Sequence, residues 1–234
     1  MDVRRVSDGL WRWTLPHPAW KPEFDRPDGW GRLVASVYAE TERAIVLIDP
    51  LLPGEGAELA TFWSALDRDV ARVGRPIAIL VASVDHGRSA DAIAARYRAG
   101  GREVAVVGDD AIHEDVSCTL DLGFDRAPLG NDVEAIPVLG TMPGEHAIVL
   151  RRWRAAVFAD AVIGAGDGAV RVAPPSWGVR TPEGRARYDA HFRASLGRVL
   201  ALDPDILLPS HGEPVVGGGG AALAAALAAP AWGA

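Results

Sequence analysis

The stretch ILVASVDHGRSAD, residues 79–91, carries the most informative pattern of this 234-residue chain. Its continuous aliphatic run predicts a strand over residues 77–82 that is buried on both faces of a sheet. The run leads into Asp85-His86, and small residues then begin a predicted helix over residues 89–99. Loops at strand ends commonly carry function because a rigid scaffold positions them. This loop is therefore the first candidate site.

Further strands and helices are expected on both sides of this stretch. Residues 33–38 and 44–48 are β-rich runs joined by a polar stretch, which predicts a hairpin. The other expected elements are a helix at 55–72, strands at 104–107, 133–139, 146–150 and 155–159, a Pro/Gly-rich loop at 164–178, a helix at 182–202, a strand at 206–208 and an Ala-rich helix after Gly217. This order predicts two stacked sheets flanked by helices.

Composition restricts the class of protein. Hydrophobic residues make up 49% of the chain, but no stretch approaches 18 consecutive apolar residues, so we expect a globular protein without a membrane partner. The net charge of −7 argues against a nucleic-acid partner. The single cysteine, Cys118, excludes an intramolecular disulfide, and with no visible secretory signal we expect a cytoplasmic location. The sequence is compatible with a homo-oligomer.

Five segments in a fixed order carry a family resemblance: VLIDP (46–50), ASVDHGR (82–88), GTMPGE (140–145), VFAD (157–160) and LLPSHG (207–212). Together they resemble the strand-end motifs of the metallo-β-lactamase fold superfamily. The resemblance implies an α/β fold, an αββα sandwich of two stacked mixed β-sheets flanked by helices. We expect a single domain over residues 1–234, with a Trp/Pro-rich segment at 1–32 and a Gly/Ala-rich C-terminal helix at 217–234.

The resemblance also implies which positions bind metal. Proteins of this superfamily usually hold two zinc ions on histidines and carboxylates. Their ligand positions fall here on Ser83, Asp85, Gly87, Arg88, Thr141, Asp160 and His211. Only three of these residues retain a metal-binding group, and a shift of register that uses His86 still produces no H-x-H motif. We therefore predict that the dinuclear site is lost.

Three functional hypotheses follow. In the first, no cofactor is bound, and a pocket for a small-molecule ligand or substrate supports metal-independent chemistry or simple binding. Its catalytic candidates are His86, Asp160 and His211, and its pocket candidates are Asp49, Ser83, Asp85, Arg88 and Thr141. In the second, a hydrolase of a thioester, lactone or other ester holds one zinc or other divalent metal on Asp85, His86, Asp160 and His211. In the third, the protein is a non-catalytic structural or interaction partner.

Each candidate also has a purely structural interpretation. Asp160 and His211 could serve only to hydrogen-bond the strand-end loops. His86 is either a general base, because imidazole titrates near neutral pH, or a buried helix cap. Arg88 is expected to contact Asp85 or Asp160 as a counter-ion, with a solvent-facing side chain as the alternative.

The N-terminal tryptophans and the other histidines are assigned less specific roles. We expect Trp11 and Trp13 to pack the N-terminal strand against the sheet, and we keep Trp20 and Trp30 as candidates for a lid over the pocket. Residues His17, His113 and His191 lack convergent partners in the sequence, so we expect them outside the site.

Overall fold

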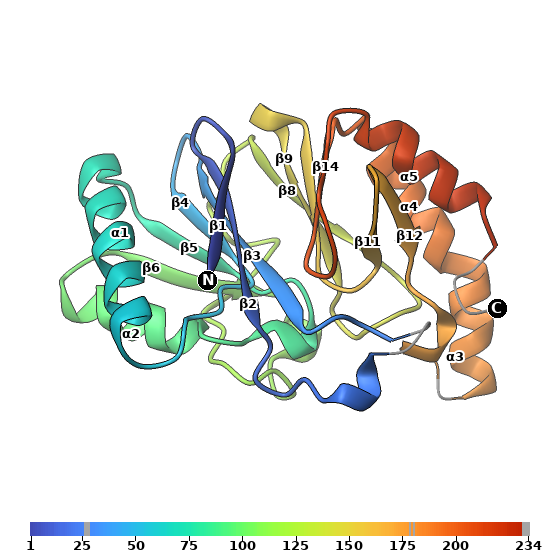
Figure 1. The fold of residues 1–234 in the computed structure, drawn as a ribbon, viewed down its shortest axis with the longest axis horizontal. Helices are drawn as coiled ribbons and strands as arrows, with labels where there is room; N and C mark the ends of the chain where they lie inside the picture. Colours follow the sequence, from blue (N-terminus) through green and yellow to red (C-terminus); the bar gives the residue numbers. More distant parts are fainter. Residues whose placement is uncertain (26–28, 178, 180, 231–234) are drawn as a thin grey trace.

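The computed structural model describes residues 1–25, 29–177, 179 and 181–230. Four layers lie side by side in Figure 1: helices, a first sheet, a second sheet and helices again. Helices α1 (Ala57–Val73) and α2 (Ala90–Ala99) cover the outer face of the first sheet. Helices α4 (Arg193–Leu200) and α5 (Gly219–Ala228) cover the second. The predicted αββα sandwich is confirmed.

The first sheet contains seven strands that lie in chain order. They are β1 (Asp2–Ser7), β2 (Leu10–Pro16), β3 (Leu33–Glu40), β4 (Ile45–Ile48), β5 (Ile77–Leu80), β6 (Val104–Gly108) and β7 (Leu122–Gly123). Strands β1 to β4 pair antiparallel, and β4 to β7 pair parallel. Parallel neighbours end at the same sheet edge, so the loops after β4 and β5 lie together.

The second sheet has the order β14-β13-β10-β9-β8. Its strands are β8 (Val133–Pro137), β9 (His146–Leu150), β10 (Ala155–Phe158), β13 (Ile206–Pro209) and β14 (Val215–Val216). Strands β10 and β13 pair parallel, while the other pairs are antiparallel. The loops after β10 and β13 therefore share one edge.

Alternating side chains of the central strands build three hydrophobic clusters. In β4, Ile45 and Leu47 pack toward α1 and α2, whereas Val46 and Ile48 pack between the two sheets. This alternation follows from the two-residue period of a strand. Each fully buried aliphatic side chain contributes roughly 1.5–3 kcal/mol to folding. Central strands buried on both faces thus hold the strand ends in place.

Two expectations about the elements need correction. The predicted loop at 164–178 contains a hairpin, β11 (Val162–Gly166) with β12 (Ala169–Val172), although Gly178 lies outside the described residues. The predicted helix at 182–202 is divided into α3 (Pro182–Arg187), a π-helical segment and α4. The N-terminal strand expected at the edge of the sheet is present as a pair of strands, β1 and β2.

The described part of the C-terminal region agrees with an Ala-rich helix. Helix α5 ends at Ala228, and residues 231–234 of the predicted C-terminal segment lie outside the described residues. No helix in the described ranges has both the length and the apolar character that a membrane span requires.

Candidate functional site

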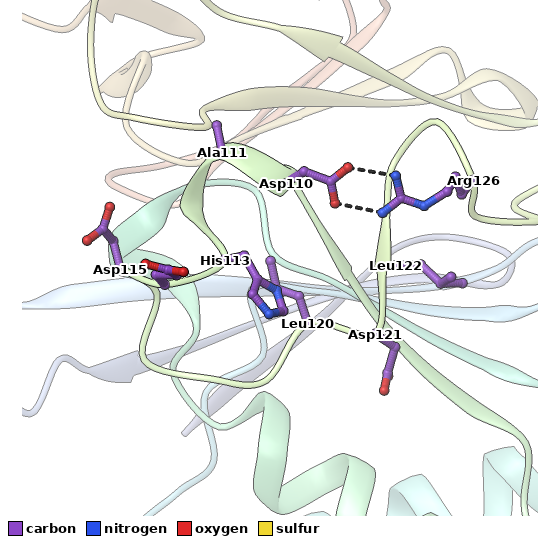
Figure 2. A pocket seen from close by; sticks show the side chains of 9 residues that line it. Asp110, Ala111, His113, Asp115, Leu120, Asp121, Leu122 and Arg126 are labelled. Carbon is purple, nitrogen blue, oxygen red and sulfur yellow. Dashed lines mark hydrogen bonds and ion pairs between the residues drawn. The ribbon is translucent and has the colours of Figure 1, made fainter.

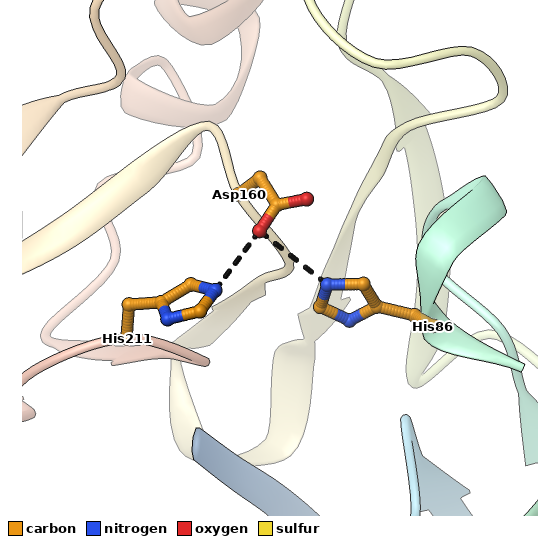
Figure 3. A group of neighbouring side chains, drawn as sticks. All are labelled: His86, Asp160 and His211. Carbon is orange, nitrogen blue, oxygen red and sulfur yellow. Dashed lines mark hydrogen bonds and ion pairs between the residues drawn. The ribbon is translucent and has the colours of Figure 1, made fainter. Parts of the chain in front are cut away.

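Three side chains from distant parts of the chain meet where the strands end. His86 lies in the loop after β5, Asp160 follows β10, and His211 follows β13. Figure 3 shows the two imidazole rings on either side of the Asp160 carboxylate. All three residues are buried, and each offers a ligand atom that lies within 4.8 Å of the other two. The three residues are far apart in the sequence, and they meet because parallel strands end at the same edge of a sheet.

The Asp160 carboxylate is the centre of the cluster. Its Oδ1 lies 3.1 Å from His211 Nε2 and 3.4 Å from His86 Nε2. Burial raises the pKa of this carboxyl, but the two histidines outweigh burial and hold the pKa well below its ordinary value. Asp160 is therefore a carboxylate at neutral pH.

A second carboxylate, that of Asp49, contacts the ring nitrogen of His86 that faces away from Asp160. Asp49 Oδ2 lies 2.7 Å from His86 Nδ1, and Asp49 Oδ1 accepts a hydrogen bond from the Ala82 backbone N–H at 2.8 Å. Burial and Arg88 lower the pKa of His86, but Asp49 and Asp160 outweigh them and raise it to about 9. Asp49 thus orients the ring so that Nε2 faces the cluster.

The loop that carries His211 is held by close backbone contacts. Gly164 in β11 donates its N–H to the His211 carbonyl at 2.9 Å. A Cβ at Gly164 would lie 2.1 Å from the Glu213 carbonyl, so this position accepts only glycine. The buried Arg12 guanidinium donates to the Gly212 carbonyl at 2.6 Å. These contacts position the imidazole, whose Nδ1 is buried and has no hydrogen-bond partner in the described part of the chain.

Glu145 was not among the predicted site residues, yet it supports Asp160 directly. Its Oε1 accepts hydrogen bonds from the backbone N–H groups of Asp160 (2.9 Å) and Ala161, and its Oε2 accepts from Thr141 Oγ1 at 2.6 Å. Burial and the nearby Asp160 raise the pKa of Glu145 to about 7. The signal in the sequence was a carboxylate that directly precedes the fully buried strand β9.

Arg88 lines the cavity beside the cluster, but its predicted partners were wrong. Its guanidinium donates to the carbonyls of Ala35 (2.8 Å) and Asp49 (2.9 Å) and to Ser210 Oγ (2.7 Å). These acceptors at the strand ends take the place of the predicted ion pair with Asp85 or Asp160, and Nε has no hydrogen-bond partner among the described residues. Burial lowers the pKa of Arg88, and the charges of Asp49 and Asp160 act against that effect.

The remaining predicted pocket residues lie at different depths. Asp85 is exposed and lines the same cavity as His86, outside the group of three convergent side chains. Ser83 is fully buried, and its Oγ has no hydrogen-bond partner among the described residues. Thr141 contacts Glu145 as described above. At Gly87, a Cβ would lie 2.7 Å from Ser117 Oγ, which leaves little room for a ligand side chain at that position.

A cavity of about 470 Å³ opens onto the cluster. Trp30 and Trp177 contact the His211 ring edge-on, with ring centroids 5.2 and 5.6 Å away. The wall also includes Phe24, which stacks on Trp30. Trp30 therefore lies over the site, as expected of a lid candidate, whereas Trp20 only donates its indole N–H to the Trp30 carbonyl.

His17 was expected outside the site, but it lines this cavity. Its ring lies edge-on to Trp30 with centroids 5.2 Å apart. Partial burial, followed by the charges of Arg88, His211 and His86, lowers the pKa of His17 to about 4. His17 is therefore neutral at physiological pH. The two other histidines that were expected outside the site, His113 and His191, are exposed and do not line this cavity.

A larger cavity of about 590 Å³ lies elsewhere and shares no lining residue with the first. Figure 2 shows that Asp110 and Arg126, two of its lining residues, form a paired carboxylate and guanidinium. Apart from His113, its other lining side chains are acidic or aliphatic. It contains none of the predicted site residues.

The donor set of the cluster fits one divalent metal. Two imidazoles and a carboxylate suit zinc and other first-row metals. Metal–ligand bonds of about 2.0–2.1 Å in tetrahedral geometry place ligand atoms about 3.3 Å apart. The measured separations from Asp160 Oδ1 are 3.1 and 3.4 Å. Asp49 on His86 Nδ1 supplies the carboxylate–histidine contact that commonly orients a metal-binding imidazole. His86, Asp160 and His211 would hold such an ion.

Solved structures confirm the fold. A β-lactamase domain protein from Burkholderia ambifaria superposes with a TM-score of 0.61 at 18% identity, covering 96% of this chain and 75% of its own. A metallo-β-lactamase from Pontibacter korlensis gives 0.60 at 15% identity, covering 97% and 98%. A metallo-β-lactamase from Pseudomonas aeruginosa in its mono-zinc form gives 0.61 at 14% identity, covering 97% and 94%.

Sequence comparison alone finds no relative: no family model and no curated protein matches this chain. The structural likeness shows that the chain has the metallo-β-lactamase fold.

Proposed function

We propose that the protein is a hydrolase that uses one divalent metal ion, held by His86, Asp160 and His211, to cleave an ester, thioester or lactone. The observation that carries the proposal is the convergence of these three buried side chains at the wall of a 470 Å³ cavity. The mono-zinc form of the Pseudomonas aeruginosa metallo-β-lactamase supports a single-metal arrangement on this fold.

A bound metal would polarise the substrate carbonyl and lower the pKa of a metal-bound water. The chain itself supplies orientation. Asp49 holds the His86 ring, and Glu145 holds the backbone at Asp160. Trp30 and Trp177 flank His211 and exclude bulk water from that side of the cluster. A substrate of small-molecule size fits the volume of the cavity.

The predicted loss of the dinuclear site is part of this proposal. Within the described residues, the only group of three or more potential ligands is His86, Asp160 and His211. Ser83, Gly87 and Thr141 stand at three of the expected ligand positions and offer no strong metal-binding group. The proposal is therefore one ion per chain.

The test is hydrolysis measured as a function of metal content. Protein treated with a chelator should be inactive toward a panel of p-nitrophenyl esters, thioesters and lactones. Activity should return with zinc, manganese or cobalt and saturate at one equivalent. His86→Ala and His211→Ala should each lower kcat/KM by about 100-fold or more, because each removes a proposed metal ligand, and even the loss of a group that orients a ligand commonly costs about 10–100-fold. His113→Ala, at an exposed position, is the matched control. Full activity after chelation, or bound metal without any hydrolysis, would overturn the proposal.

A metal-free pocket is the second candidate, and one observation favours it. His86 lies between Asp49 and Asp160 with both ring nitrogens facing carboxylates, an arrangement that suits an imidazolium. In that state the site would bind a small molecule, or catalyse proton transfer through His86, without a metal. Activity or ligand binding that survives chelation would select this candidate.

A non-catalytic role has less support. A vestigial pocket would be filled by side chains, whereas the described residues leave about 470 Å³ open beside the cluster.

A further inference from the structure

Asp85 is a charged group in the cavity that the proposed hydrolysis does not use. It is exposed, it lines the cavity, and it makes no hydrogen bond or ion pair with any described residue. An aspartate at the surface needs no partner, because water solvates it. An aspartate at the wall of a ligand cavity, however, adds an unbalanced negative charge to whatever binds there.

The other charged side chains of the cavity are less exposed than Asp85. Arg88 is half-buried and donates to two carbonyls and to Ser210 Oγ, while its Nε has no hydrogen-bond partner among the described residues. Asp160 is buried between two histidines. His17 is neutral at physiological pH, since its pKa is lowered to about 4. Among the described lining residues, Asp85 is thus the exposed charged side chain.

Aromatic rings line the same cavity as this carboxylate. Trp30, Trp177 and Phe24 line the cavity together with Asp85. Aromatic faces attract cations through their quadrupole, and tryptophan does so most strongly. A wall of two indoles and a phenyl ring accompanied by a free carboxylate is chemically suited to an alkylammonium group.

We propose that the cavity binds substrates that carry an alkylammonium group, which Asp85 and the rings of Trp30 and Trp177 receive. This inference rests on the proposed function, because it places the cation next to the bond that the site would cleave. Asp85 then acts as a specificity-determining residue rather than as a metal ligand. The ester of an amino alcohol or of a quaternary ammonium alcohol, or the thioester of the corresponding thiol, is the substrate class that combines both features.

The test compares two ligands of the same shape. Choline carries a quaternary nitrogen, and 3,3-dimethyl-1-butanol has a carbon atom in its place. Binding to the full chain is followed by tryptophan fluorescence and calorimetry, both after chelation and with one equivalent of zinc. We expect choline to bind at least about tenfold more tightly than the alcohol, a preference of the size that cation–π contacts and a carboxylate supply together. Added salt should weaken choline binding and leave the alcohol unaffected.

Variants then assign the preference to Asp85. Asp85→Asn should raise the Kd of choline by about fivefold or more and leave that of the alcohol within about twofold. Asp115→Asn, an exposed aspartate outside this cavity, should change neither. Equal binding of the two ligands, no measurable choline binding, or an Asp85→Asn variant with the wild-type preference would each overturn the inference.

The same variant separates this inference from the proposed function. If Asp85→Asn still binds one zinc ion and hydrolyses neutral esters, a failed choline test removes only the substrate class. If Asp85→Asn loses the zinc ion, Asp85 is a metal ligand and the assignment as a cation receptor is wrong. If the wild-type protein binds choline but no metal, the proposed hydrolase fails and the cavity remains an ammonium-binding site.

Discussion

At the scale of single residues, the site depends on groups that hold the three convergent side chains in place. Asp49 accepts from the Ala82 backbone and contacts His86 Nδ1, so one carboxylate joins a strand end to a candidate ligand. The Asp49→Asn variant keeps an acceptor for Ala82 but loses the charge behind His86. We expect its affinity for zinc to fall by about tenfold or more, as losses of such supporting contacts commonly do.

Competition with a zinc chelator of known affinity measures this effect. Asp67→Asn is the control, because Asp67 pairs with Arg96 on the surface and neither residue lines the cavity. Unchanged zinc affinity in Asp49→Asn would show that the His86 ring is held by other contacts.

Arg88 is expected to matter for stability through its carbonyl contacts. Arg88→Ala removes three hydrogen bonds from a charged donor, although Ser36 Oγ still donates to the Asp49 carbonyl and Ser210 Oγ to the Ala35 carbonyl. A hydrogen bond to a charged group contributes about 1.5–3 kcal/mol, so we expect the free energy of unfolding to fall by about 3 kcal/mol or more. Urea denaturation measures it, with exposed Arg96→Ala as a control that should cost less than about 1 kcal/mol. Equal stability of the two variants would refute the assigned role.

His17 should make stability depend on pH. Its pKa is lowered from 6.5 to about 4 in the folded state, first by burial and then by nearby positive charges. Between these two values the unfolded chain binds more protons than the folded one, so this contribution to stability falls as the pH drops below about 6.5. NMR titration of the His17 ring should give a midpoint near 4. The His17→Asn variant should lose part of the acid sensitivity, and a midpoint near 6.5 would contradict the burial of this ring in the cavity.

At the scale of elements, the hairpin β11–β12 and the loop after β13 depend on each other. Gly164 approaches the Glu213 carbonyl so closely that Gly164→Ala requires the backbone to move. We expect a loss of about 3 kcal/mol in stability, since overpacking of a tight contact costs about 1–3 kcal/mol or more. The His211 loop should shift as well.

Gly197→Ala is the matched control for this change. Gly197 lies in α4 with no neighbour near its missing Cβ, so alanine should stabilise the helix by roughly 0.5–1 kcal/mol. Thermal unfolding of the two variants gives the comparison. A stable Gly164→Ala protein with unchanged zinc affinity would show that this contact does not position His211.

The elements differ in how far the sequence predicted them. Buried strands such as β5 and β9 were predicted because they are continuous apolar runs with polar ends. The hairpin β11–β12 was missed because its turn, Gly166-Asp167-Gly168, has the composition of a loop, while all three residues adopt the positive φ that a tight turn requires. Local composition does not separate a tight hairpin from an irregular loop.

The candidate site was predicted in part for a similar reason. Asp160 and His211 follow strands, so their convergence could be expected from the family resemblance. Glu145, His17 and Trp177 could not be placed, because their positions depend on how the second sheet and the N-terminal segment pack. Arg88 was placed correctly in the loop but given the wrong partners, since charge pairing alone does not account for unsatisfied carbonyls at strand ends.

At the scale of the whole molecule, the αββα sandwich brings residues 86, 160 and 211 to one cavity, although they come from both sheets. The central claim is that this chain holds one metal ion at a place where proteins of the superfamily usually hold two. The most direct measurement is an anomalous difference map from crystals of the full chain grown with zinc. We predict one peak bounded by His86 Nε2, Asp160 Oδ1 and His211, with none beside Ser83 or Thr141. A second peak at those positions, or no peak at the three convergent residues, would contradict it.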